Sequence, residues 1–403
     1  MSELSAFLKE LHEHVAPENS EQRLQIGAST SKRIYGLDAT RAILLLGGPL
    51  VHSVFSSYST PLLQLAVQTS HLFRMSAFFM IAAYLAALNT KSSQPRWLIG
   101  RMQQLLISLA TMCVIMELVG QWAKVYHPSL SLTPPLIPLH LWFLVALAAV
   151  SPITGMLDRS LRAQGFVTFV GCRPVVLLGL ALCTSLLFTV LARSLRDTSF
   201  SSLTFVNLWL PVLLVDAPKH AVFYLLGYTV ARSAYFRRFV FDPKFVATGI
   251  ASLAASLLIY SLSGGDSFLN SAASPLKVVV LIIFECTKIL MGLTILSLAL
   301  RCSRAPTLLL WLSKASYTIY LLHFPFIILI SYSIINIYPS INSYILFFTC
   351  FALSLGLSCG AYALMSHSQI AMFLFNGKQI RLGKATKLPF VGKLLKSRDL
   401  TTA

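Results

Sequence analysis

The sequence predicts an all-α, polytopic membrane protein with about ten transmembrane helices and both termini in the cytoplasm. Hydrophobic residues make up 56% of the 403 residues, and charged residues only 11%. A soluble domain carries about 25% charged residues, so most of this chain is expected to lie in lipid. Apolar stretches long enough to cross a bilayer recur along the chain, and the basic residues between them are unevenly distributed.

The elements follow in order along the chain. Residues 1–33 are polar and predict a cytoplasmic extension with a short amphipathic helix. Residues 34–366 predict a transmembrane domain, and 367–403 a basic cytoplasmic tail. Between the fifth and sixth spans, 198–217 is expected to be a re-entrant or interfacial segment. The expected spans are 37–58, 71–89, 98–120, 139–157, 174–192, 218–232, 245–262, 276–300, 308–332 and 342–364.

Charge sets the expected orientation and some of the expected partners. Twelve Lys and Arg lie in the loops that are cytoplasmic if the N-terminus is inside, against four in the opposite loops. The net charge of +18 is scattered in short clusters between apolar runs. This placement favours contact with anionic membrane lipid and argues against a nucleic-acid partner. The seven cysteines lack metal-ligand spacing, so we expect neither a metal site nor a tightly bound cofactor.

Arg41 and His52 are the leading candidates for a functional site. They lie eleven residues apart in the first expected span. Eleven steps bring a helix roughly 20° past three full turns, so both side chains share one face, about 16 Å apart along the axis. A guanidinium or imidazole in the hydrocarbon zone is costly unless it faces a polar cavity or polar partners.

Other ionisable residues recur inside the expected spans. His71 and Arg74 open the second span one turn apart, so both are expected on one helix face near the external side. His140 opens the fourth span and His323 lies in the middle of the ninth; for each, a structural hydrogen bond is the simpler expectation. Glu285 and Lys288 of the eighth span are three residues apart and are expected to neutralise each other.

Five motifs in order resemble integral-membrane acyltransferase family 3. They are Arg41-x10-His52 within Leu37-Asp-Ala-Thr-Arg, Phe73-Arg-Met-Ser-Ala-Phe-Phe, His140-Leu-Trp-Phe-Leu, Phe223-Tyr-Leu-Leu-Gly and Ser316-Tyr-Thr-Ile-Tyr-Leu-Leu-His-Phe-Pro. The resemblance covers about residues 34–332 and, more weakly, the last span. The second and third motifs look most like those of members that succinylate periplasmic glucans.

The resemblance implies transfer of an acyl group, succinyl or acetyl, from acyl-CoA to a hydroxyl of a periplasmic or cell-surface glycan, at a bacterial inner membrane. His52, Arg41 and Arg74 match residues that the family needs for catalysis. Neutral histidine, with an ordinary pKa near 6.5, is a natural general base for a hydroxyl nucleophile. A guanidinium holds thioester oxygen or phosphate through fixed donors. Arg41 is expected at the CoA end and Arg74 at the acyl or acceptor end. The candidate binding residues are Asp38, His71, Arg101, His140 and His323.

Two positions depart from the family pattern. Ala82-Ala83 stand where the family commonly has Ser-Gly, and Arg101-Met-Gln-Gln104 keeps only the first arginine of the usual Arg-x-x-Arg. Arg96 lies five residues before Arg101, on the opposite flank of a helix, so it is a poor replacement.

Two alternatives stay open. A proton-coupled secondary transporter would use Glu285 and Lys288 as a relay, although the two halves show no internal repeat. A catalytically inactive relative would only scaffold glycan assembly. The sequence leaves the acyl group, the glycan and the oligomeric state undetermined.

Overall fold

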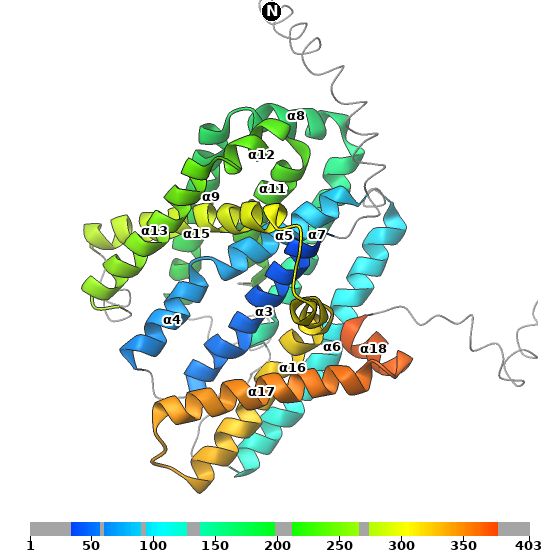
Figure 1. Ribbon diagram of the computed structural model, residues 1–403, viewed down its shortest axis with the longest axis vertical. Coiled ribbons are helices and arrows are strands. Elements are labelled where there is room, and N and C mark those ends of the chain that lie inside the picture. Colours follow the sequence, from blue (N-terminus) through cyan, green and yellow to red (C-terminus); the bar gives the residue numbers. More distant parts are fainter. Residues whose placement is uncertain are drawn as a thin grey trace, which may run out of the picture.

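The computed structural model describes residues 34–56, 60–89, 94–126, 138–197, 212–265 and 274–377. These residues form helices and connecting turns, with no strand among them (Figure 1). The predicted extension 1–33 and most of the predicted tail lie outside the described residues. The helices are α3 (Tyr35–Ser56), α4 (Pro61–His71), α5 (Arg74–Leu88), α6 (Pro95–Tyr126), α7 (Pro138–Arg159), α8 (Leu161–Gly171), α9 (Pro174–Asp197), η1 (Val212–Asp216), α11 (Ala217–Arg232), α12 (Ala234–Val240), α13 (Pro243–Leu262), α15 (Pro275–Arg301), α16 (Thr307–Ile337), α17 (Ser343–Met365) and α18 (Gln369–Asn376).

Local sequence signals set many of the helix starts. Six helices begin with proline, whose missing N–H is not needed in the first turn. Polar side chains cap others: the Ser160 hydroxyl accepts a hydrogen bond from the Ala163 N–H at the start of α8, and Asn342 does the same for Tyr344 at the start of α17.

The chain is an all-α polytopic membrane protein, as predicted. Eight helical segments among the described residues are long and apolar enough to cross a bilayer. The prediction of ten spans also counted α3 and α11, which are not among these eight. α3 carries Asp38, Arg41 and His52, and α11 has only 16 residues. The count of ten and the orientation therefore stay predictions.

The second span differs from its prediction. It runs over Pro61–Leu88 and is broken at Leu72 and Phe73 into α4 and α5. The expected start at residue 71 was wrong because α4 contains several polar residues, which led us to leave it out of the span. The break also separates His71, at the end of α4, from Arg74, at the start of α5. The two residues therefore do not share the face of one continuous helix.

Three short helices were not predicted. α8 and α12 connect longer helices at one end of the bundle (Figure 1). α18 lies within the residues expected to form the tail, yet it packs against α6, α16 and α17. Only the end of the predicted segment 198–217 is described, where η1 forms a π-helical turn that leads into α11.

The packing places α3 between other helices. It contacts α4 and α5, α15, α16 and α17, and Figure 1 shows it in the middle of the bundle. Behind α5 lies α11, the neighbour with which α5 makes its most extensive contact. Gly227 permits this approach, because a Cβ there would overlap the backbone of Met80. The glycine of Phe223-Tyr-Leu-Leu-Gly thus has a packing role.

Candidate active site

A partly open cavity lies where α3, α5, α7 and α16 meet. Its polar wall contains two histidines and one arginine, and no carboxylate is found among the described residues that line it. Aromatic and aliphatic side chains form the rest of the wall. The lining residues are Leu44, Leu45, Gly48, His52, Arg74, Met75, Phe78, Trp142, Phe143, Tyr320 and His323. The wall therefore combines basic nitrogen atoms with an apolar surface.

His52 and His323 face each other in this cavity. Their ring centroids are 5.3 Å apart, and the Phe324 ring packs edge-on against His52 at 4.9 Å. His323 is fully buried, and its Nδ1 lies 3.0 Å from the carbonyl oxygen of Ile319, one turn earlier. A carbonyl accepts only, so Nδ1 carries the proton and Nε2 of the neutral ring is an acceptor. The structural hydrogen bond expected of His323 is present, and the same ring also lines the cavity.

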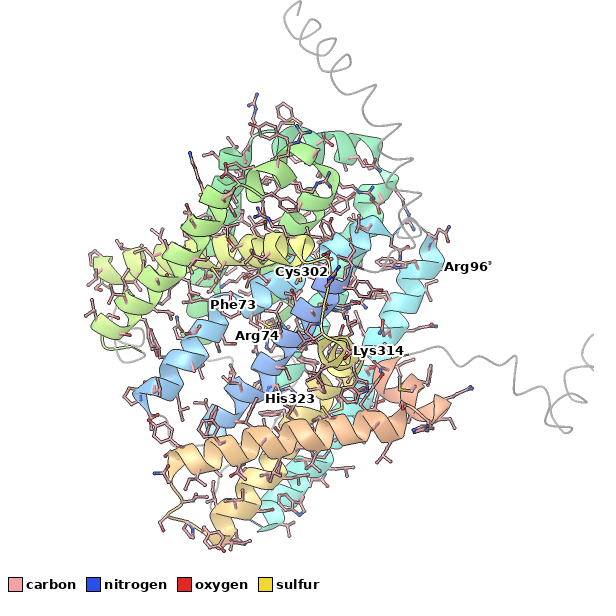
Figure 2. All side chains as sticks on the ribbon, viewed as in Figure 1. Phe73, Arg74, Arg96, Cys302, Lys314 and His323 are labelled. Atoms are coloured by element: carbon pink, nitrogen blue, oxygen red, sulfur yellow. The ribbon has the colours of Figure 1, made fainter. Side chains whose placement is uncertain are left out.

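Arg74 reaches the cavity from the first turn of α5. Its Nε is buried and makes no hydrogen bond within the described part of the chain. A methyl group placed on Gly48 would lie 3.5 Å from Nη1 of Arg74 and 3.3 Å from Nε2 of His323, so both nitrogens approach α3 at the same place. Figure 2 shows Arg74 and His323 together near the centre of the molecule. The positive end of the α5 dipole adds to the charge of the guanidinium, which favours an anionic oxygen here.

A second basic group lies at the N-terminal end of α3. Nη1 of Arg41 is 3.9 Å from Oδ1 of Asp38, and Arg101 of α6 lies near enough for the two arginine charges to repel. Tyr317 and Tyr224 lie close to Arg101. Counted alone, the group formed by Asp38, Arg41 and Arg101 carries one positive charge in excess. Neither Arg41 nor Arg101 lines the cavity around His52.

Glu285 forms a separate buried cluster between α9, α11 and α15. The predicted pair with Lys288 is confirmed, with Nζ 2.7 Å from Oε1. The structure adds Lys219, whose Nζ lies 3.1 Å from the same oxygen, and the hydroxyls of Ser185 and Thr189 at 2.7 and 3.0 Å. Glu285 itself is completely buried. Its carboxylate is therefore held by four donors, the arrangement that a buried structural charge needs.

Comparison with known proteins agrees with the motifs. A family model for an acyltransferase domain matches residues 34–363, which is most of the chain. The chain belongs to acyltransferase family 3. Neither the comparison with curated proteins nor the comparison with solved structures gives a match. The chain is thus a multi-pass membrane acyltransferase.

The acyltransferase fold brings together only some of the predicted site residues. His52, Arg74 and His323 meet in the cavity, and Asp38 pairs with Arg41 near the start of α3, where the charge of Arg101 also acts on Arg41. His71 is exposed and does not line the cavity, because the break after α4 turns it away from α5. The backbone of His140 lies in the first turn of α7, but its side chain lies outside the described part. Their binding roles stay predictions.

Sequence reasoning did not place two members of the cavity wall among the candidate site residues. Trp142 and Tyr320 both line the cavity. The signal available was their place inside the motifs of α7 and α16. Arg96, considered as a replacement for the missing arginine of α6, is exposed at the edge of the molecule in Figure 2 and lies on a different part of α6 from Gln104.

Proposed function

We propose that this acyltransferase moves a short acyl group, succinyl or acetyl, from acyl-CoA in the cytoplasm to a hydroxyl of a periplasmic or cell-surface glycan. The observation that carries the proposal is the meeting of His52, Arg74 and His323 in one cavity, whose described lining residues include no carboxylate. Acidic side chains there would compete for the arginine and would repel the negative charge that develops during thioester attack. The bacterial inner membrane is the expected location.

The proposed reaction is a single displacement at the thioester carbonyl. The glycan hydroxyl oxygen attacks the carbonyl carbon while the imidazole of His52 takes the hydroxyl proton. Negative charge gathers on the carbonyl oxygen, which Arg74 stabilises. The carbon–sulfur bond then breaks, CoA leaves as the thiolate, and the proton on His52 returns to sulfur. The products are the acyl ester and CoA thiol, so atoms and charge balance.

Arg41 and Arg101 are proposed to hold the phosphates of the donor. The two cations lie within repulsion range, so a polyanion that enters between them would relieve the repulsion that the pairing of Arg41 with Asp38 leaves. The positive-inside distribution places this end of α3 in the cytoplasm, where acyl-CoA is available. The acyl chain would then extend along α3 toward His52, about 16 Å away along the helix axis.

Acyl transfer by the purified protein tests the proposal. Full-length protein in nanodiscs is supplied with radiolabelled succinyl-CoA or acetyl-CoA in separate reactions, with a periplasmic glucan extract as acceptor. We expect label in the glycan with one donor and its loss by about two to four powers of ten in His52→Ala. Mass spectrometry of envelope glycans from a deletion strain and a complemented strain identifies the natural acceptor. Solute uptake into proteoliposomes without an acyl donor, with no transfer in any reaction, would contradict the proposal.

A further inference from the structure

Gln104 lies at the position where the family pattern usually has the second arginine of α6. In this chain the Gln104 side chain makes two hydrogen bonds: its oxygen accepts one, and its nitrogen donates the other. Nη1 of Arg101 donates to Oε1 of Gln104 at 3.1 Å, and Nε2 of Gln104 donates to the carbonyl oxygen of Asn376 at 3.2 Å. Gln104 thus connects Arg101, one turn earlier on the same helix, to the end of α18.

The end of α18 is closely fitted to α6 at this residue. Gly377 ends the helix in the left-handed conformation, with φ of +57°, and its N–H donates to the carbonyl oxygen of Phe373 at 2.9 Å. A Cβ at Gly377 would overlap the backbone of Gln104. Glycine is therefore required at position 377 for two reasons, the left-handed backbone conformation and the close approach of α6.

Further contacts hold α18 in place. The side chain of Asn376 is buried, and its Nδ2 donates to Oγ1 of Thr318 on α16 at 3.4 Å. Met372 is buried against Ala315 and Ile319 of α16. The position of Asn376 is thus fixed by the bundle and not only by Gln104.

We propose that Gln104 is a positioning residue through which the docked helix α18 sets the orientation of Arg101 for the acyl donor. The inference rests on the proposed function in one respect, the contact of Arg101 with the donor. The amide suits this task because it is neutral. Its oxygen takes one of the five guanidinium donors and holds the side chain, yet it leaves the positive charge uncancelled. A carboxylate would hold Arg101 equally well but would neutralise it.

Donor kinetics of three variants test this coupling. Gln104→Ala removes both hydrogen bonds, and Gly377→Ala pushes the end of α18 away from Gln104, because the added Cβ would overlap the backbone of that residue. Ile370→Ala is the matched control, since this residue of α18 is 66% exposed. We expect the first two variants to raise KM for acyl-CoA about three- to tenfold, the effect of one lost hydrogen bond, with kcat within about twofold. The control should match the wild type.

Binding of coenzyme A itself, measured by calorimetry, provides a readout that is independent of turnover. We expect the same weakening in Gln104→Ala and Gly377→Ala. Gln104→Glu should weaken binding at least as much, because it cancels the charge of Arg101 and loses the donor to Asn376.

The outcomes separate this inference from the proposed function. Wild-type protein that neither transfers acyl groups nor binds coenzyme A contradicts the proposed function. Active wild-type protein whose Gln104→Ala variant keeps normal coenzyme A affinity contradicts only the coupling. A loss of kcat and thermal stability with unchanged KM would make α18 a purely structural element, which also overturns the inference. If Gly377→Ala does not fold, Gln104→Ala and Gln104→Glu decide.

Discussion

Replacing Arg74 with methionine is expected to separate activity from stability. The Nε of Arg74 is buried and makes no hydrogen bond within the described chain, and the cavity wall around it has no carboxylate. A buried polar group left without a partner destabilises a protein by about 1–3 kcal/mol. Methionine is shorter than arginine and has no polar hydrogen, so Arg74→Met removes this penalty and keeps the packing of the aliphatic stem.

We therefore expect the free energy of unfolding of Arg74→Met to be unchanged or to rise by about 1–3 kcal/mol. Acyl transfer should fall by about 10²–10³, the usual effect of removing one donor to a developing oxyanion. Thermal unfolding in nanodiscs and the radiolabel transfer assay measure the two quantities on the same preparation.

Arg232→Met is the matched control. Nη2 of Arg232 lies 2.6 Å from Oδ1 of Asp158, whose side chain is only 6% exposed, and the Tyr228 hydroxyl donates to the same oxygen at 2.7 Å. Removing this arginine leaves a buried carboxylate short of a partner, so we expect a loss of about 1–3 kcal/mol of stability with little direct effect on the chemistry. If Arg74→Met instead lost several degrees of Tm and activity fell only in proportion to the folded fraction, Arg74 would be structural and the reasoning refuted.

Three other substitutions probe the same account. Gly48→Ala places a methyl group 3.3 Å from Nε2 of His323. We expect kcat to fall about tenfold while the fold is retained. Normal turnover would show that this side of the cavity is not used. Glu285→Ala removes the shared partner of two half-buried lysines and leaves the buried Ser185 hydroxyl without its acceptor, so it should destabilise the protein by about 1–3 kcal/mol. An unchanged Tm would contradict the structural role of the cluster. Gly227→Ala forces α11 away from the backbone of Met80, so the free energy of unfolding measured with denaturant should fall by about 1–3 kcal/mol. Wild-type stability would mean that α11 and α5 are not in close contact.

The sequence predicts the membrane class of the fold and the most informative helix. Composition alone requires lipid as solvent, and the spacing of Arg41 and His52 places both on one face of one helix. The pairing of Glu285 with Lys288 also follows from spacing, because residues three apart on a helix are neighbours. Local periodicity suffices for each of these predictions.

Other features depend on contacts between distant segments. No local pattern shows that α16 brings His323 to within 5.3 Å of His52, ring centroid to ring centroid, or that Lys219 joins Glu285 from another helix. The break at residues 72–73 was missed because α4 ends in the polar run Gln68-Thr-Ser-His71, which by composition resembles the end of a loop, although these residues are helical. α18 was assigned to the tail because its eight residues are too few to span a bilayer, whereas its stability comes from docking on α6.

An experimental density map of the full-length protein with a non-hydrolysable acyl-CoA analogue tests the central claim most directly. The account predicts the acyl carbonyl in the cavity, with its oxygen about 2.7–3.1 Å from the guanidinium of Arg74 and room for a hydroxyl between its carbon and the His52 ring, and with the CoA phosphates between Arg41 and Arg101. A map in which the His52 ring contacts only lipid tails, or in which the analogue binds away from this cavity, would contradict it.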